Sequence, residues 1–454
     1  MKSYLRLILS AVFGICLSSS TFAADFKPGK GVFNPQTFTL KNGLQVIVIE
    51  NHRAPVVIQQ IWYKNGFIDD PDGKSGIAHF LEHMMFSPDF MQSVARIGGE
   101  QNAFTGKEFT SYYQAVRIEA LPIVMQMEAE RMANLSTKSE KVETERKVII
   151  EERRMRIDNS PSAILGEAML RNFFWNHLYG RPGIGWEHEM TKLSQQDVID
   201  FYKKWYVPNN AVLILAGDIT LSKAKELAEK YYGKIPSRPI NTKRNYLVEP
   251  IHRGVAQRII LKHELVNEPM IDIMIKAPSY NSEGKEHAYA LEVATYLLGN
   301  GPTSLLYKKL AKEKRLASLI AMDYDPIALG PSFISISAQP APGVKIEDLE
   351  AALVAQIDQV IKNGVTKEQV QKAQKRMVAG IQYVKDSSFG GVEEFGRALT
   401  GGLDINHVEK WPDQIMAVTP LQVNAAIKSI FDTDEKLTGL LLPAKKAPTT
   451  KPIK

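Results

Sequence analysis

The most informative stretch of the 454-residue chain reads Gly76-Ile-Ala-His-Phe-Leu-Glu-His-Met-Met-Phe86. Its apolar residues recur with the spacing of a helix. Residues four apart lie on one helix face, so His79 and His83 can offer two imidazoles to one metal ion. Glu82 faces nearly the same side, where a carboxylate can accept a proton from metal-bound water. The simpler interpretation is that two histidines fall four residues apart on an ordinary helix. The rest of the sequence has to decide between this interpretation and a metal site.

A two-histidine site needs a third protein ligand, because a catalytic zinc ion usually keeps three. The best candidate segment covers residues 139–155, which are rich in helix formers and contain no Gly or Pro. Glu145, Val148 and Glu152 share one face of this predicted helix, whereas Glu151 lies about 100° away from it. A face that combines an apolar residue with two carboxylates suits a helix that lines a polar cavity. A solvated charged helix is the usual meaning of such a run, so the segment alone leaves both alternatives open.

Together the two segments resemble the M16 family of zinc metallopeptidases, the pitrilysin-type or inverzincin family. Within this family the chain is M16B-like and resembles the zinc-bearing subunit of mitochondrial processing peptidase. The resemblance implies that zinc is held by His79, His83 and Glu152. It also implies that Glu82 is the general base and that Glu145 is a supporting carboxylate near the site.

Three further segments match the same family, at residues 98–105, 179–185 and 206–218. In the family, the first of them forms an edge strand beside the zinc. The resemblance therefore predicts that substrate lies extended along Asn102 and Ala103, held by main-chain hydrogen bonds. We expect unfolded peptides or extended segments as substrates, because a folded protein cannot present an isolated strand.

The N-terminal 23 residues have the pattern of a secretory signal peptide, with a basic start, an apolar core and a run of small residues. We expect cleavage between Ala23 and Ala24 and a periplasmic mature protein. The apolar core is too short for a stable membrane span, and no later stretch qualifies. The only cysteine, Cys16, lies inside the signal, so zinc in the mature chain would be held by nitrogen and oxygen.

The composition is that of a globular protein, with 44% hydrophobic and 23% charged residues. Loss of residues 1–23 removes two basic residues, Lys2 and Arg6, and no acidic one, so the formal net charge falls from +6 to +4. This charge is modest, and the sequence has no basic stripe with interleaved aromatic residues. Nucleic acid is therefore not an expected partner.

A chain of this length is too long for one simple core. Its first half begins with a strand, an Asn42-Gly43 turn, a second strand and a third strand at residues 56–63. The second half weakly repeats the strand-strand-helix order without the metal residues. We therefore expect an α+β fold of two related domains, each a mostly antiparallel sheet covered by helices, as in the LuxS/M16-type metallohydrolases. The predicted parts are a signal peptide (1–23), an N-terminal zinc-binding peptidase domain (24–235), a linker (236–252), a C-terminal domain without a metal site (253–443) and a disordered tail (444–454).

Three of the histidines outside the motif are given no functional role. His177 and His188 look like loop or surface residues, and His287 is interpreted as structural. Glu292 follows His287 by five residues, which does not place the two on one helix face.

One departure from the family concerns the second domain. Many M16 enzymes carry an Arg and a Tyr seven residues apart that contact substrate, and Ala311 and Ser318 stand at these positions here. Neither can supply the cation or the phenol. The resemblance therefore predicts a heterodimer with an M16 homologue that carries the Arg/Tyr pair. A homodimer that uses Lys312 or Arg315 instead is the alternative.

The sequence thus predicts a zinc-dependent endopeptidase that acts on peptides. The alternative is a non-catalytic M16-like binding or structural subunit. Relatives of that kind typically have broken zinc motifs, whereas all five polar positions of the motif are intact in this chain.

Overall fold

The computed structural model describes residues 31–444, apart from 87, 136–138, 241–243, 245–248, 250–254, 388 and 434. The predicted signal peptide, most of the predicted linker and all but the first residue of the predicted tail lie outside the described residues. The two domain bounds therefore remain predictions. Among the described residues, no helix has both the length and the apolar character needed to cross a membrane.

The first sheet has six strands in the order β1-β2-β6-β3-β5-β4. All neighbouring strands are antiparallel except β2 and β6. The predicted turn at Asn42-Gly43 joins β1 to β2, and Gly43 has the positive φ of 86° that favours glycine. The strands are β1 (Gln36–Thr39), β2 (Gln45–Glu50), β3 (Val56–Tyr63), β4 (Glu100–Thr105), β5 (Thr110–Arg117) and β6 (Ala211–Gly217).

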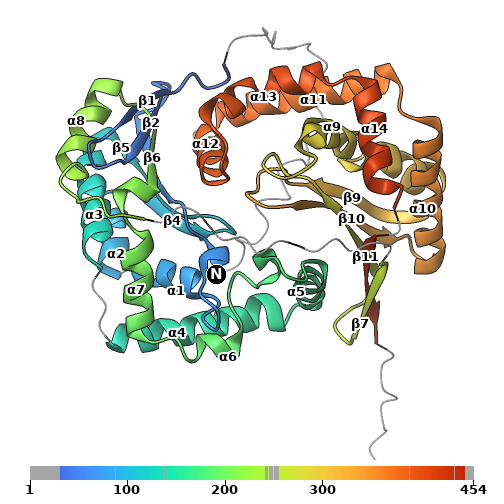
Figure 1. Ribbon diagram of the computed structural model, residues 1–454, viewed down its shortest axis with the longest axis horizontal. Coiled ribbons are helices and arrows are strands. Elements are labelled where there is room, and N and C mark those ends of the chain that lie inside the picture. Colours follow the sequence, from blue (N-terminus) through green and yellow to red (C-terminus); the bar gives the residue numbers. More distant parts are fainter. Residues whose placement is uncertain are drawn as a thin grey trace, which may run out of the picture.

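One face of this sheet packs against helices from the same half of the chain, around a core that includes Leu44, Ile61 and Leu81. These helices include α1, α3 and α7, and Figure 1 shows them grouped around the first sheet. The helices of this half are α1 (Ile77–Met85), α2 (Pro88–Arg96), α3 (Leu121–Ala133), α4 (Ser139–Arg153), α5 (Pro161–Phe173), α6 (Glu187–Met190), α7 (Gln195–Trp205) and α8 (Leu221–Tyr231). Short 3-10 turns cover Phe67–Asp69, Ile118–Ala120, Leu178–Gly180 and Pro208–Asn210, and a π-helical turn, Arg154–Asp158, continues α4.

The second sheet repeats this plan with five strands in the order β7-β11-β8-β10-β9, in which only β7 and β11 are parallel. The prediction of two related α+β domains with mostly antiparallel sheets is confirmed. Its strands are β7 (Gln257–His263), β8 (Met270–Ala277), β9 (Ala317–Tyr324), β10 (Ser332–Pro340) and β11 (Lys436–Pro443). Its helices are α9 (Ala288–Gly299), α10 (Ile346–Asn363), α11 (Lys367–Asp386), α12 (Gly390–Thr400), α13 (Ile405–Ala417) and α14 (Pro420–Phe431), with a 3-10 turn at Lys285–His287 and a π-helix at Tyr307–Glu313.

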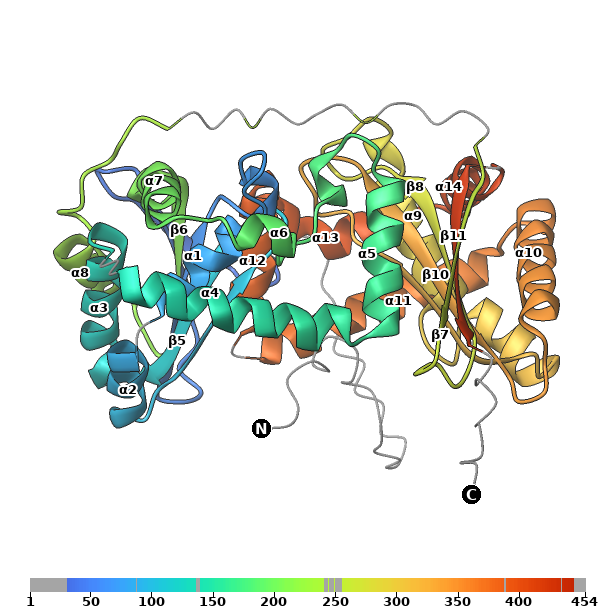
Figure 2. The same cartoon turned by 90° about the horizontal axis from the view of Figure 1, so that it is seen from below.

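Each domain contributes one helix that packs on the sheet of the other domain. Helix α5 of the first domain packs on β7 and β11, where Met169 joins a cluster with Leu437 and Leu441. Helix α12 of the second domain packs on β3 and β6, where Phe395 lies against Trp62 and its neighbours. Figures 1 and 2 show each of these helices beside the other domain's sheet. Each sheet is therefore covered on one face by a helix that belongs to the opposite half of the chain.

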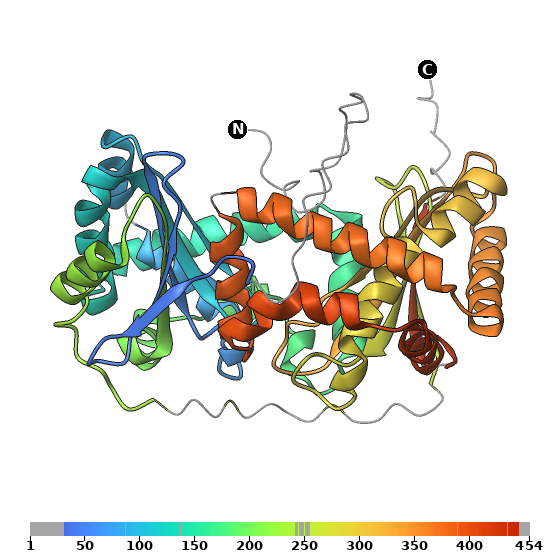
Figure 3. The ribbon, with the colours of Figure 1, turned by 90° about the horizontal axis from the view of Figure 1, so that it is seen from above.

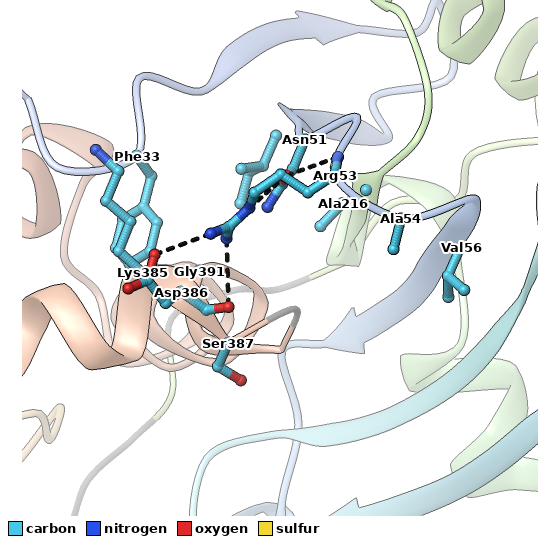
Figure 4. Close-up of a pocket in the computed structure, with 12 residues that line it drawn as sticks. Phe33, Asn51, Arg53, Ala54, Val56, Ala216, Lys385, Asp386, Ser387 and Gly391 are labelled. Atoms are coloured by element: carbon cyan, nitrogen blue, oxygen red, sulfur yellow. Dashed lines mark hydrogen bonds and ion pairs between the residues drawn. The ribbon is translucent and has the colours of Figure 1, made fainter.

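Helices α11 and α13 connect the two ends of the molecule, and Figure 3 shows them running side by side. At the end of α11, Arg53 Nη1 lies 3.0 Å from Asp386 Oδ1, and its Nη2 donates to the Asp386 carbonyl at 3.3 Å. This contact closes one wall of an interdomain pocket of about 300 Å³. Figure 4 shows that Phe33, Lys385 and the Arg53 side chain line it. No residue of the predicted metal site contributes to this pocket.

Candidate metal centre

The start of helix α1 is held by a buried carboxylate. Asp70 accepts the N–H of Gly76 at 2.6 Å and the N–H of Ala78 at 3.1 Å. Gly76 has φ +85°, and a Cβ there would come too close to the carbonyl of Ile184. A glycine is therefore required where the metal-site helix begins.

The end of α1 is held by two cations from neighbouring helices. Lys141 Nζ donates to the carbonyls of Met84 and Phe86, each at 2.7 Å. Arg131 Nη1 donates to the carbonyl of Met85 at 3.2 Å. Cations are favourable at a helix C-terminus, where the last carbonyls have no partner within the helix. Because Lys141 belongs to α4, it also ties together the two helices that carry the predicted ligands.

The three predicted ligands converge between α1 and α4. One ligand atom from each of His79, His83 and Glu152 lies within 4.8 Å of the others. Glu152 Oε2 is 3.2 Å from His83 Nε2 and 3.7 Å from His79 Nε2. The 3.7 Å separation is too long for a hydrogen bond. Two imidazole nitrogens and one carboxylate oxygen are also a donor set that catalytic zinc sites use, so these residues fit a zinc ion.

Glu82 lies beside this cluster and is 9% exposed. Its Oε2 accepts a hydrogen bond of 2.5 Å from Thr105 Oγ1, at the end of β4. Burial raises the pKa of Glu82, while the Thr105 hydroxyl acts in the opposite direction. A carboxylate held in this way is suited to accept and return a proton.

Three carboxylates of α4 near the cluster have different partners. Glu145 Oε2 lies 3.3 Å from His83 Nδ1, so it orients the imidazole from the side opposite Glu152. Glu152 Oε1 is 2.6 Å from Arg156, which restrains the second carboxylate oxygen. Glu151 is 61% exposed and pairs with Arg154 instead.

The two histidines differ in their electrostatics. Burial, with a smaller contribution from His83, lowers the pKa of His79 to about 4. Burial also lowers the pKa of His83, but its hydrogen bonds to Glu145 and Glu152 outweigh this and raise it to about 9. His79 is therefore held as a neutral imidazole, the form in which histidine binds metals.

The predicted substrate strand is also next to the site. Strand β4 is the outermost strand of its sheet, and among the described residues only β5 pairs with it. Ala103 is buried toward α1, and Asn102 Oδ1 accepts the main-chain N–H of Ala103 at 2.9 Å. Within the described residues one edge of β4 is unpaired by any strand. The role of Asn102 and Ala103 in substrate binding stays a prediction.

The two positions of the missing Arg/Tyr pair differ in burial, since Ala311 is partly buried and Ser318 is exposed. Ala311 packs against the core of the second domain. Ser318 Oγ donates to the carbonyls of Gln339 and Pro340, at 3.3 and 3.1 Å. Lys312 and Arg315 are both exposed.

His177 was interpreted as a loop or surface residue, and it lies in a loop but not at the surface. His177 is only 3% exposed and packs against Tyr179, 4.1 Å between ring centroids. His188 is exposed, as expected. Glu292 is buried and accepts hydrogen bonds from Tyr280 and Trp411, and burial raises its pKa to about 7.

Thr105, Lys141 and Arg156 were not singled out from the sequence. For Thr105 a signal existed, because residues two apart in a strand face the same side. Since Ala103 was predicted beside the zinc, Thr105 belongs on the same face. Lys141 and Arg156 had no comparable signal, since cations are common on exposed helices.

Comparisons with known proteins identify the family of the chain. Residues 45–185 match the model of the family described as Insulinase (Peptidase family M16). Residues 192–377 match the model described as Peptidase M16 inactive domain. A relative named zinc protease PqqE, from Helicobacter pylori, is 30% identical over 375 residues, which cover 80% of this chain and 82% of the relative.

Solved structures have the same fold. A protease from Helicobacter pylori superimposes with a TM-score of 0.83 at 27% identity, covering 90% of this chain and 99% of that one. The periplasmic protease PqqL from Escherichia coli has a TM-score of 0.75 at 18% identity, and the match covers 90% of this chain but 47% of PqqL. The fold and the clustered site thus define a two-domain protein of the metallopeptidase class. The chain belongs to peptidase family M16.

Proposed function

We propose that the chain is a zinc-dependent endopeptidase that hydrolyses unfolded peptides or extended segments. The observation that carries this proposal is the convergence of His79, His83 and Glu152 beside the buried carboxylate of Glu82. The H. pylori relative named a zinc protease supports the same activity. A chain that kept the fold only as a scaffold would have no need for this arrangement.

In the proposed site, His79, His83 and Glu152 would hold zinc, which when bound would supply a Lewis acid and an activated water. Glu82 would act as the general base, accepting a proton at its carboxylate and returning it to the leaving amine. Thr105 directs the Glu82 carboxylate through their 2.5 Å hydrogen bond. Glu145 supports the reaction by holding the His83 ring.

We further propose that the peptide adds as a strand to the open edge of β4, near Asn102 and Ala103. This places the main chain of the peptide next to α1. Main-chain pairing reads the backbone more than side chains, which suits unfolded substrates. A periplasmic location fits the signal-like N-terminus and the periplasmic protease PqqL, which has the same fold.

The test is to compare the wild-type chain with the Glu82→Gln variant. The variant should keep its zinc and its melting temperature but hydrolyse an unstructured peptide about 10²–10⁴-fold more slowly, since it lacks the general base. Zinc content is measured by atomic absorption and hydrolysis by mass spectrometry. Equal turnover by both proteins would exclude Glu82 as the base. No zinc-dependent turnover in either protein, with any native partner present, would favour the non-catalytic subunit.

A further inference from the structure

A second candidate site lies in the C-terminal domain, far along the chain from the metal ligands. It is a pocket of about 60 Å³ between α9, the segment that follows α9 and the first half of α11. Its polar lining includes Thr303, Ser304, Lys308, Gln369, Lys372 and Arg376, and Tyr296 also lines it. Every one of these side chains can donate a hydrogen bond, and none carries a negative charge.

The sequence of α11 builds one wall of this pocket. Gln369, Lys372, Ala373 and Arg376 follow the i, i+3, i+4, i+7 spacing, so they share one helix face. The small side chain at Ala373 leaves room between the three longer ones. The opposite wall brings Lys308 to the same space.

The three cations of the pocket have no acidic partner in the described part of the chain. Among the described residues, no carboxylate lies within salt-bridge distance of Lys308, Lys372 or Arg376. By contrast, the adjacent Lys309 pairs with Glu313 at 2.7 Å. All three side chains are exposed, so solvent and salt screen their mutual repulsion, but together they make the rim of the pocket positively charged.

A buried hydroxyl in the pocket also lacks a partner. Ser304 is 3% exposed, and its Oγ makes no hydrogen bond within the part of the chain that the structure describes. An unpaired buried hydroxyl is costly, so such groups usually bind a ligand or water. Next to it, Arg376 Nη1 donates to Thr303 Oγ1 at 2.6 Å. Because the Thr303 oxygen accepts this bond, its own O–H remains free to donate into the pocket.

We propose that this pocket binds a phosphate group. Arginine and lysine together are a common recognition set for phosphate, and the hydroxyls of Thr303 and Ser304 would donate to its oxygens. The pocket is much smaller than the roughly 300–1,000 Å³ of sites that enclose whole small molecules. It therefore has room for a single phosphate group, either as the free ion or at the end of a larger molecule. This site is independent of the proposed peptidase centre.

The test is thermal unfolding of the full mature chain in increasing inorganic phosphate, with ionic strength held constant by chloride. We expect a saturable rise in melting temperature of about 3 °C at a tenfold excess over Kd. Arg376→Gln, Lys372→Gln and Ser304→Ala should each lose most of this rise. The matched control is Lys375→Gln, which removes the same charge from α11 at a position outside the pocket, and it should keep the rise.

Phosphoserine, tested in parallel, separates the two sources of the group. If both compounds raise the melting temperature, the pocket accepts phosphate on a larger molecule. If only inorganic phosphate raises the melting temperature, the pocket binds the free ion. The absence of a saturable rise with either compound would overturn the proposal. The proposal would also be overturned if Lys375→Gln and Lys372→Gln lost the phosphate-dependent rise in melting temperature equally. That result would mean that phosphate acts by general charge screening.

Discussion

At the scale of single residues, the two adjacent carboxylates of α4 show how the site is selected. One step along a helix turns a side chain by about 100°. Glu152 therefore points toward His83 and is 13% exposed, whereas Glu151 is 61% exposed and pairs with Arg154. The two carboxylates are chemically identical, but only Glu152 faces the two histidines and can bind the same metal ion.

Substitution of these two carboxylates tests the ligand assignment. We expect Glu152→Gln to lose most of its zinc, because a neutral amide is a weaker ligand than a carboxylate. Glu151→Gln should bind one zinc per chain, like the wild type. Both are measured by atomic absorption after dialysis. Retained zinc in Glu152→Gln together with lost zinc in Glu151→Gln would reassign the third ligand.

The Thr105 hydroxyl should matter for turnover rather than for zinc binding. We expect Thr105→Val to lower kcat about tenfold, since a hydrogen bond to a charged group contributes roughly 1.5–3 kcal/mol. KM and zinc content should change little, and Thr105→Ser should restore most of kcat. The measurements are steady-state peptide hydrolysis and metal content.

Thr110 provides the control for this prediction. It lies opposite Thr105 in the β4-β5 register, but its hydroxyl donates to the carbonyl of Asn65. Thr110→Val should therefore reduce stability while leaving kcat near the wild-type value. A similar loss of kcat in both variants would show that Thr105 acts only through the fold of the hairpin.

At the scale of elements, the position of α1 depends on contacts at both of its ends. Asp70 holds the first turn, and Lys141 and Arg131 hold the last carbonyls. The contact of α12 with the first sheet adds a second constraint on this sheet, because α12 covers the face that α1 does not cover. The tightest point of this contact is Gly396, where a Cβ would overlap the ring of Trp62.

Gly396→Ala should destabilise the protein. Trp62 is fully buried and cannot move aside, so the added methyl group should cost about 1–3 kcal/mol through overpacking. The control is Gly380→Ala in α11, where a Cβ would meet nothing within 4 Å. This change should stabilise the helix by about 0.5–1 kcal/mol. Urea unfolding of both variants measures the difference, and equal stability of the two would contradict the importance of this contact.

At the scale of the whole molecule, the metal site is open to one side. The side chains of His83 and Glu145 are 21% and 22% exposed, although Glu82 beside them is buried. The present chain matches less than half of the E. coli protease PqqL, so PqqL is about twice as long. These observations support a proposed assembly in which a second unit covers the peptide.

We therefore expect the isolated chain to bind zinc but to cleave unstructured peptides slowly. A homologous partner with the Arg and Tyr that Ala311 and Ser318 replace should raise the activity by a large factor. Copurification from native cells and size-exclusion chromatography would identify the partner or reveal a homodimer. Full activity of a purified monomer, unchanged by any copurifying chain, would rule out the assembly model.

The local features of this protein were determined by its sequence. The i, i+4 histidines, the shared face of Glu145 and Glu152 and the Asn42-Gly43 turn depend on backbone periodicity within a few residues. The resemblance to the M16 family then added the prediction that His79, His83 and Glu152 are the zinc ligands. Only the tertiary structure decided which helix covers which sheet, that His177 is buried and that Thr105 binds Glu82. These outcomes depend on packing between segments distant in the chain, and a side chain's burial is a property of its neighbours in space rather than of its own sequence window.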